Sequence, residues 1–217
     1  GLVGSEMCIR DSLRTHWILN GVGFEDPPSV SIDSEVQIEV DVRIRSNTQL
    51  RGKTSIASGT IVGPNANLTD VSTQENCIIG ASTLDGVTIE ANVQIGPYCH
   101  LRENTYLSSS SRIGSHVETK NTRIGTNSTV AHFCYLGDAT IGENVNIGAG
   151  TVTCNFDGKT KHQTHINDGA FIGSSTMLIA PITIGFDSAT GAGSVVKQDV
   201  PDGTTVAGVP AKEINTG

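Results

Sequence analysis

Aliphatic side chains recur along this sequence at every sixth position, with polar or small residues between them. The first unbroken series runs through Ile32, Ile38, Ile44, Leu50, Ile56, Val62 and Leu68. After local insertions or deletions the interval resumes at Ile89, Ile95, Leu101, Leu107 and Ile113, at Ile124, Val130 and Leu136, at Ile141 and Ile147, and at Ile166, Ile172, Leu178 and Ile184. A period of six matches neither a helix nor a simple alternating strand, so it indicates an internal repeat.

Glycine often follows the aliphatic residue, as in Ile95-Gly96 and Ile147-Gly148, and a small residue often sits two or three places later. This is the hexapeptide-repeat pattern, in which each unit supplies one short strand and a corner, and three units make a triangular coil of about 18 residues. The sequence therefore predicts an all-β fold, a left-handed parallel β-helix of about nine coils over the 166 residues from Ile32 to Lys197.

The segments outside the repeat suggest the domain organisation. Residues 13–26 are expected to be a truncated linker helix and the lead-in to the β-helix, with Leu13, Trp17 and Ile18 at helical spacing and Gly21 as a cap. The β-helix is expected over residues 27–200 and a C-terminal tail over 201–217. Residues 2–12 resemble one reading frame of a common sequencing-library adapter, so residues 1–12 are expected to be a read-end scar.

Composition narrows the possible functions. Aromatic residues make up only 4% of the chain, so the core must be aliphatic. No run of about 18 apolar residues or secretion signal occurs, so we expect a cytoplasmic protein without a membrane partner. The net charge of −8 argues against general nucleic-acid binding, and any anionic ligand needs a local basic pocket. The five cysteines lack a C-x-x-C pair and are expected to be reduced.

Irregular spacing locates the candidate chemistry. Two intervals shorten to five, from Thr119 to Ile124 and from Leu136 to Ile141, and the polar segment 154–165 interrupts the repeat like an extruded loop. Because these breaks cluster between residues 119 and 166, we expect the functional residues there.

Three motifs carry a resemblance to a known family: GPYCHLR (Gly96–Arg102), VETK (Val117–Lys120) and AHFCYLGDATIGENVNIGAGTVTCNFDGK (Ala131–Lys159). With the segment Asn20–Pro27, they make roughly residues 13–217 resemble the acetyltransferase domain of the bacterial bifunctional N-acetylglucosamine-1-phosphate uridyltransferase/glucosamine-1-phosphate acetyltransferase. The resemblance implies acetyl transfer from acetyl-CoA to the amine of glucosamine 1-phosphate, a step toward UDP-N-acetylglucosamine and cell-wall precursors. No Gly-rich nucleotide signature is present, so the uridyltransferase half, for which the family needs Mg²⁺, is expected to lie outside this fragment.

The resemblance also implies catalytic residues. His132 matches the family's general base, and a neutral imidazole suits removal of a proton from an amine at pH 7. Glu118 matches a carboxylate near that histidine, which would fix its tautomer. Asn155 matches the residue that holds the reacting groups by hydrogen bonds. No metal is expected in this fragment.

A second set matches the family's sugar-phosphate residues. Arg102 and Lys120 lie 18 residues apart, so the repeat predicts that they stack on adjacent coils. Two adjacent cations suit a phosphate, which arginine binds in bidentate fashion. Tyr135, Asn146 and Lys161 match the remaining sugar-side residues, and the first two are expected at corners that face a neighbouring prism.

Small residues match the family's acetyl-CoA groove, namely Ala149, Ser174 and Ala192, together with Asn155. Two positions depart from the family: Phe156 replaces a frequent tyrosine, loses its hydroxyl and is expected to line the acetyl-CoA site by apolar packing alone, and Gly208 stands where an arginine contacts the CoA phosphates. Lys212 is expected to supply the missing charge. Because aliphatic side chains fill the coil interior, the ligands need grooves between prisms, which predicts a homotrimer with shared sites.

Three other interpretations stay open on the sequence. A zinc lyase on this scaffold needs three converging histidines, and His162 and His165 lack the expected spacing. Another hexapeptide-repeat sugar N- or O-acyltransferase would share the CoA groove and differ in the set of Arg102, Lys120 and Tyr135. A non-catalytic prism would lose nothing when His132 is replaced.

Overall fold

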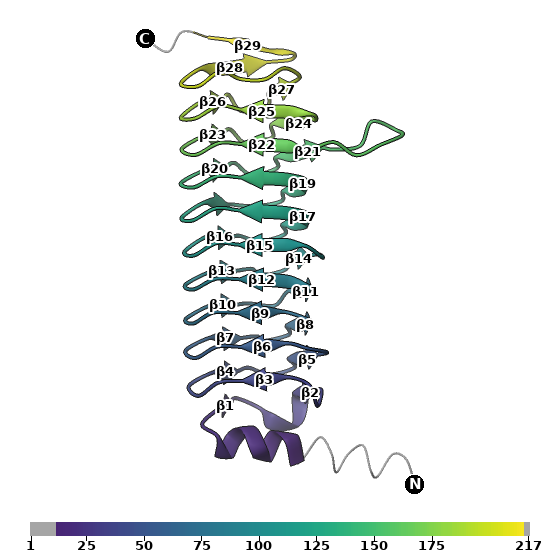
Figure 1. Cartoon of the computed structure of the whole chain (residues 1–217), viewed down its shortest axis with the longest axis vertical. Helices are drawn as coiled ribbons and strands as arrows, with labels where there is room; N and C mark the ends of the chain where they lie inside the picture. The colour runs from purple at the N-terminus through teal and green to yellow at the C-terminus, as the bar shows by residue number, and fades with distance from the viewer. Residues whose placement is uncertain (1–11, 215–217) are drawn as a thin grey trace.

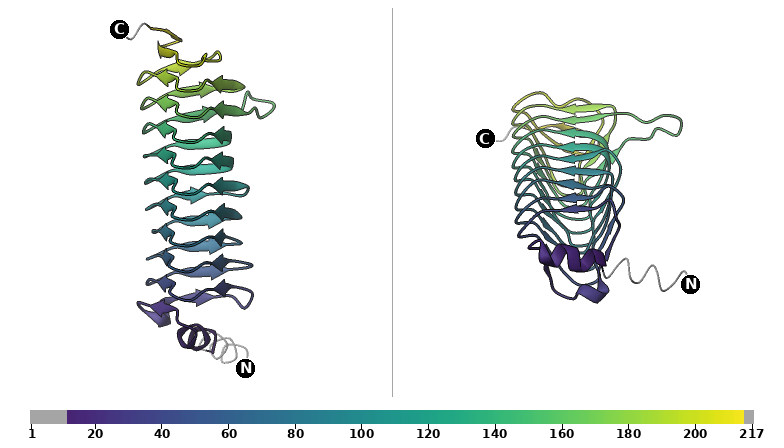
Figure 2. Two further views of the ribbon diagram at one scale, coloured as in Figure 1. Left: turned by 60° about the vertical axis from the view of Figure 1, so that its left-hand side comes forward. Right: turned by 60° about the horizontal axis from the view of Figure 1, so that its bottom comes forward.

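Each hexapeptide forms one short strand, and three strands close a triangular coil that stacks on the next (Figures 1 and 2). The computed structural model describes residues 12–214. It contains 29 strands, one 3₁₀ helix at Pro27–Ser29 and a helical segment at residues 12–19. The chain is an all-β, left-handed parallel β-helix, as the repeat predicts.

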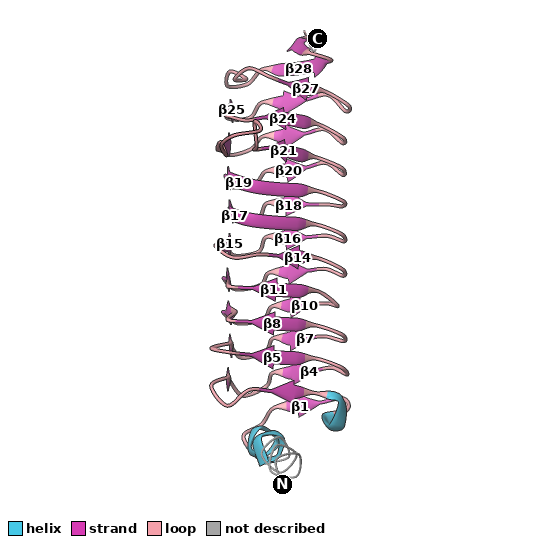
Figure 3. Cartoon of the chain, turned by 90° about the vertical axis from the view of Figure 1, so that its right-hand side faces the viewer, coloured by secondary structure: helices cyan, strands magenta, loops and turns pink. Residues whose placement is uncertain are grey.

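The strands form three faces, with strands from successive coils paired in parallel on each face (Figure 3). Face 1 contains β2 (Ser31–Ile32), β5 (Gln49–Arg51), β8 (Asn67–Thr69), β11 (Thr83–Asp85), β14 (His100–Leu101), β21 (Val152–Cys154), β24 (Met177–Ile179) and β27 (Val195–Val196). Face 2 contains β3 (Gln37–Ile38), β6 (Ser55–Ile56), β9 (Ser72–Thr73), β12 (Val87–Ile89), β15 (Thr105–Leu107), β22 (Thr164–Ile166) and β25 (Ile182–Ile184). The long strands β17 (Glu118–Ile124) and β19 (Tyr135–Ile141) run through both faces.

Face 3 is a separate 12-stranded sheet. Its strands are β1 (Gly23–Phe24), β4 (Arg43–Ile44), β7 (Ile61–Val62), β10 (Ile78–Ile79), β13 (Gln94–Ile95), β16 (Arg112–Ile113), β18 (Thr129–Val130), β20 (Asn146–Ile147), β23 (Phe171–Ile172), β26 (Ala189–Thr190), β28 (Thr205–Gly208) and β29 (Ala211–Glu213). All pairs in this sheet are parallel except β28 with β29, which are antiparallel.

The core is a continuous aliphatic column. Every aliphatic residue that recurs at the six-residue interval is buried. The largest fully buried side chains include Ile44, Leu50, Leu101 and Leu136. Identical positions stack because the parallel register pairs repeat residues directly, for example Leu101 with Thr119 and Thr119 with Leu136. The side chains that carry chemistry must therefore lie on the outer surface or at the corners.

Both ends extend the β-helix beyond the aliphatic series, giving about ten turns. Gly23 and Phe24 pair with Arg43 and Ile44, and Thr205–Gly208 continues face 3 beyond Lys197. The helical segment ends at Leu19, and Gly21 beyond it, with φ of 86°, forms the expected cap together with the bond from Val22 N to Trp17 O (3.0 Å). Trp17 packs into the core at this end, whereas Ile18 is 47% exposed. Residues 1–11, which include most of the expected read-end scar, lie outside the described residues.

The irregular segments have structural counterparts. The shortened intervals fall within β17 and β19, whose seven residues each turn the corner between faces 1 and 2 without leaving the strand. The chain between Cys154 and Thr164 leaves the coil as a projecting loop, which confirms the expected extrusion (Figure 1). No helix among the described residues is long and apolar enough to cross a membrane.

Candidate active site

A single corner of the prism, between faces 3 and 1, aligns the predicted base with the predicted acetyl-CoA residues. Gly150 N donates to His132 O (2.9 Å), Ser175 N donates to Ala149 O (2.7 Å) and Gly193 N donates to Ser174 O (2.8 Å). These bonds place His132, Ala149, Ser174 and Ala192 at equivalent positions of successive coils. We call this series the corner column; the pairing of Thr190 with Val206 extends it to Gly208.

His132 is exposed on this column, outside the aliphatic core. Its Nδ1 lies 3.1 Å from Oγ of Ser115, the equivalent residue of the preceding coil. With Nδ1 in this contact, Nε2 is the ring nitrogen left for a ligand. Sequence reasoning missed Ser115, although its separation of 17 residues from His132 is close to one coil.

The corner lacks a competing thiol nucleophile. Cys134 is buried, and its Sγ donates to His132 O (3.1 Å). Burial raises the pKa of the Cys134 thiol above its ordinary value, so the sulfur stays protonated and weakly nucleophilic. Cys134 therefore offers no reactive thiolate at this turn.

Arg102 and Lys120 occupy equivalent positions on adjacent coils, as the 18-residue spacing predicted. Leu101 pairs with Thr119, and Arg102 N donates to Thr119 O (2.9 Å). Nη1 of Arg102 lies 3.2 Å from Oε1 of Glu118, and both side chains are partly exposed. Glu118 thus contacts Arg102, while the contact of His132 Nδ1 is with Ser115. An orienting role for Glu118 toward His132 stays a prediction.

Gly137 brings Tyr135 and Asn155 together beside this basic pair. Gly137 pairs with Lys120 in the sheet. A Cβ placed on Gly137 would lie 2.6 Å from the Tyr135 hydroxyl and 2.7 Å from Nδ2 of Asn155, so both polar groups occupy the space above this glycine. The cluster of Arg102, Lys120, Tyr135 and Asn155 is therefore contiguous along one edge of face 1.

A buried carboxylate that the sequence analysis did not single out supports Asn155. Asp138 is 8% exposed and Asn155 is 6% exposed. Oδ2 of Asp138 accepts from Nδ2 of Asn155 (2.6 Å), and Oδ1 accepts from Nδ2 of Asn121 (2.7 Å). The three residues form a hydrogen-bonded ladder across successive coils.

Two predicted sugar-side residues lie elsewhere. Tyr135 begins β19 on face 1, whereas Asn146 begins β20 on face 3 and pairs with Thr129 and Phe171. Lys161 lies on the projecting loop, where it pairs with Phe156 in an antiparallel bridge. The structure therefore brings together one part of the predicted sugar site and places Asn146 and Lys161 outside it.

Hydrogen bonds between residues of the projecting loop stabilise its conformation. Nε2 of His162 lies 2.7 Å from Oδ2 of Asp157, and the other carboxylate oxygen accepts from the backbone N–H groups of Lys159 and Thr160. The hydrogen bond from His162, followed by those from Thr160 and Lys159, holds the pKa of the Asp157 carboxyl well below its ordinary value. Phe156 at the loop base is 60% exposed.

Lys212 lies at the last coil. It pairs with Ala207 across β28 and β29, next to Gly208, and its side chain is exposed. Gly208 N donates to Oγ of Ser194 (3.2 Å). An exposed cation therefore lies beside the C-terminal end of the corner column.

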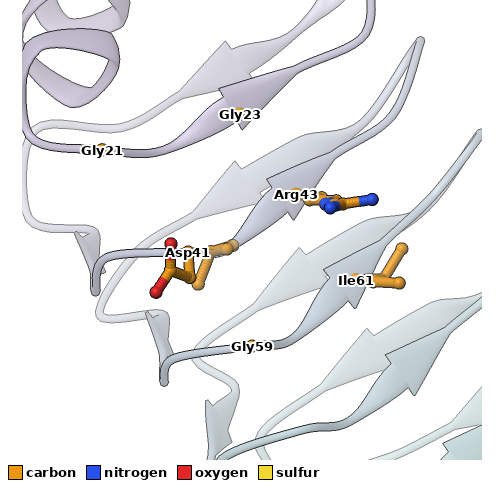
Figure 4. A pocket seen from close by; sticks show the side chains of 7 residues that line it. Gly21, Gly23, Asp41, Arg43, Gly59 and Ile61 are labelled. Carbon is orange, nitrogen blue, oxygen red and sulfur yellow. The ribbon is translucent and has the colours of Figure 1, made fainter.

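Surface grooves occur away from His132. One has a volume of about 560 Å³ and lies on face 3 near the N-terminal coils (Figure 4). It is lined by Gly21, Gly23, Asp41, Val42, Arg43, Gly59 and Ile61. A second, of about 510 Å³, includes Tyr98 and His100, two coils before His132. Neither groove is lined by a predicted site residue.

Within residues 12–214, no group of three or more His, Cys, Asp or Glu side chains is placed to hold a metal ion. His162 faces Asp157 in the loop, whereas His132 lies at the corner column and contacts Ser115. The three-histidine arrangement of a zinc lyase is not assembled within this part of the chain.

Known proteins match this chain in sequence and in fold. A family model described as bacterial transferase hexapeptide (six repeats) matches residues 121–155. The chain is 43% identical over 202 residues to the bifunctional protein GlmU of Synechococcus elongatus, covering 93% of this chain and 45% of that protein. It is 45% identical over 197 residues to the GlmU of Thermosipho africanus, covering 91% and 44%. The chain thus spans less than half the length of these relatives and resembles their C-terminal part.

Two solved structures share the fold. A UDP-N-acetylglucosamine acyltransferase from Campylobacter jejuni superposes with a TM-score of 0.60 at 17% identity, covering 86% of this chain and 73% of that chain. An Arabidopsis UDP-N-acetylglucosamine acyltransferase gives a TM-score of 0.55 at 17% identity, covering 84% and 73%. At this identity the likeness concerns the fold alone.

Proposed function

We propose that this chain transfers the acetyl group of acetyl-CoA to the amine of glucosamine 1-phosphate and forms N-acetylglucosamine 1-phosphate. The observation that carries the proposal is the alignment of His132 with Ala149, Ser174 and Ala192 on the corner that precedes face 1, while the paired cations Arg102 and Lys120 lie at the opposite edge of that face. The similarity to GlmU proteins over nine-tenths of the chain supports it.

The chemistry assigns a role to each part. The free amine attacks the thioester carbonyl, a C–N bond forms and the C–S bond breaks. Nε2 of His132 accepts the amine proton and returns a proton to the departing thiolate, which leaves as the CoA thiol. Small side chains along the corner column leave room for the pantetheine arm, and we propose that the exposed Lys212 supplies positive charge to a CoA phosphate.

The acceptor is fixed through its phosphate. Arg102 and Lys120 supply two adjacent cations, and a phosphate that binds both competes with Glu118 for the Arg102 guanidinium. Released from Arg102, Glu118 is free to serve as the orienting carboxylate for His132. Tyr135 and Asn155 contribute hydrogen bonds to the sugar and to the reacting groups.

The site is completed by neighbouring chains. Asn146 lies on face 3 and Lys161 on the projecting loop, away from the basic pair of the same chain, and we propose that both contribute to a site on an adjacent prism. A homotrimer with shared sites supplies both residues. We place the protein in the cytoplasm, in keeping with the free thiols of Cys77, Cys99, Cys134 and Cys154.

A thiol-release assay with acetyl-CoA tests the proposal by comparing glucosamine 1-phosphate with glucosamine. Loss of two charge-assisted contacts is expected to lower kcat/KM for glucosamine by at least about 100-fold. Equal turnover of both sugars would instead identify another sugar acyltransferase. Thiol release from neither sugar, by an assembled trimer, would contradict the proposal.

A further inference from the structure

The ladder Asn121–Asp138–Asn155 lies at the corner between faces 1 and 2, and its middle residue is a buried carboxylate. Asp138 has a left-handed backbone, with φ of 49°, as has Asn121, with φ of 48°. Both oxygens of Asp138 are used, one by each amide, at 2.7 Å and 2.6 Å. Three polar side chains, each about one coil apart, are thus joined by hydrogen bonds at this corner.

The chemistry of Asp138 fixes the orientation of the Asn155 amide. A carboxylate only accepts hydrogen bonds, whereas an asparagine amide offers an NH₂ donor on one side and an oxygen acceptor on the other. Asn155 must therefore turn its NH₂ group toward Asp138, and its Oδ1 points the opposite way. The backbone of Asn155 is also held, because its carbonyl accepts from His162 N (2.8 Å) and its N–H donates to Thr153 O (2.9 Å).

We infer that Asp138 is a positioning residue that makes Asn155 present its amide oxygen, as a hydrogen-bond acceptor, to an N–H group of the substrates. The inference rests on the proposed function. An acceptor oxygen at this place favours the amine as positive charge develops on its nitrogen in the transition state, so the contact contributes to kcat more than to KM. An NH₂ group turned outward would oppose the same charge.

The inference can be tested by exchanging the side chains of Asn121 and Asp138, which are hydrogen-bonded to each other. In Asp138→Asn, the new amide has one donor side and one acceptor side, so Asn155 is no longer forced into one orientation. In the double variant Asn121→Asp/Asp138→Asn, the carboxylate at position 121 accepts from the new amide, whose oxygen then accepts from Asn155. The double variant has the composition and charge of the natural chain and restores the orientation of Asn155.

The matched control is Asp70→Asn. Asp70 has a left-handed backbone, with φ of 53°, at the same corner several coils earlier, and its Oδ1 accepts from Lys53 N (2.8 Å). Because Asp70 does not contact Asn155, this control shows how an Asp-to-Asn change at the corner affects activity when the orientation of Asn155 is left unchanged. It is expected to retain the activity of the natural chain.

Kinetics with glucosamine 1-phosphate and acetyl-CoA give the readout, with thermal unfolding measured on every variant. We expect kcat of Asp138→Asn to fall by about 10-fold or more with a small change in both KM values, and the double variant to recover to within about threefold of the natural chain. Side-chain amide NMR of Asn155 is expected to follow the same order: shifted in Asp138→Asn and restored in the double variant.

The outcomes separate the two hypotheses. If the natural chain transfers acetyl groups and Asp138→Asn is equally active, the role of Asp138 is wrong while the proposed function stands. If both variants fold and the double variant is no better than Asp138→Asn, the orientation of Asn155 is not what Asp138 supplies, and the inference is overturned. If the natural chain is inactive toward this acceptor, the proposed function fails first.

Discussion

Oγ of Ser115 and Nδ1 of His132 lie 3.1 Å apart across one coil of the β-helix. The contact arises because both residues occupy the same corner position, one coil apart. A partner on Nδ1 restricts rotation of the imidazole and leaves Nε2 for the substrate amine. The β-helix itself therefore supplies the first support of the proposed base.

Ser115→Ala tests this support. We expect kcat to fall about 2- to 10-fold, as for the loss of one hydrogen bond, with a shifted midpoint in the pH dependence of kcat and little change in either KM. Ser72→Ala, an exposed serine on β9, is the matched control. An unchanged kcat and pH profile in Ser115→Ala would show that the hydroxyl does not position His132.

Arg102→Ala and Lys120→Ala test whether these two side chains bind the phosphate of glucosamine 1-phosphate. Each variant is expected to raise KM for glucosamine 1-phosphate by about 10- to 100-fold, because a charge-assisted hydrogen bond is lost, while the KM for acetyl-CoA stays within about twofold. Arg43→Ala, a basic residue of β4 on face 3, controls for the change in net charge. Equal effects on both substrates would contradict a phosphate-binding role.

Gly137→Ala tests the packing of Tyr135 and Asn155. Its Cβ would lie 2.6 Å from the tyrosine hydroxyl and 2.7 Å from the asparagine amide, so both groups must move. We expect a loss of activity of at least about 10-fold and a destabilisation of about 1–3 kcal/mol, typical of overpacking. Gly23→Ala meets only ordinary contacts of 3.7 Å or more and is expected to be neutral. Thermal unfolding and steady-state kinetics measure both effects.

The projecting loop is expected to respond to acid. The pKa of Asp157 is lowered in the folded loop, so its hydrogen bonds contribute stability above the ordinary aspartate pKa and lose it as the pH falls through the lowered value. The side-chain carboxyl ¹³C shift of Asp157 should therefore keep its ionised value from pH 7 to about pH 4 and change only below it, and the amide shifts of Lys159 and Thr160 report the hydrogen bonds to the same carboxylate. Asp157→Asn is expected to shift them already at pH 7. A midpoint at the ordinary value of about 4 would contradict the lowered pKa.

Much of the fold follows from the sequence because the repeat constrains it. The six-residue interval identifies buried positions such as Leu50 and Ile147, and the 18-residue separation of Arg102 and Lys120 gives their stacking. The count of coils fell about one short, since Gly23–Phe24 and Thr205–Gly208 lie outside the aliphatic series used for it.

The site was less accessible to sequence reasoning. Ser115 and Asp138 are polar residues at corners, and corner positions in this chain accept many residue types. Their roles depend on which side chain of the next coil they contact, and this contact depends on rotamers rather than on spacing. The partner of Glu118 illustrates the point, because the resemblance implies a contact with His132, whereas in the structure the carboxylate contacts Arg102.

His132→Ala tests the account most directly. In thiol-release kinetics with glucosamine 1-phosphate and acetyl-CoA, loss of the general base is expected to lower kcat by about 10²- to 10⁴-fold while calorimetric binding of acetyl-CoA is retained. His165→Ala, an exposed histidine of β22, is the control and should match the natural chain. Full turnover by a folded His132→Ala variant would contradict the assignment of His132 as the base.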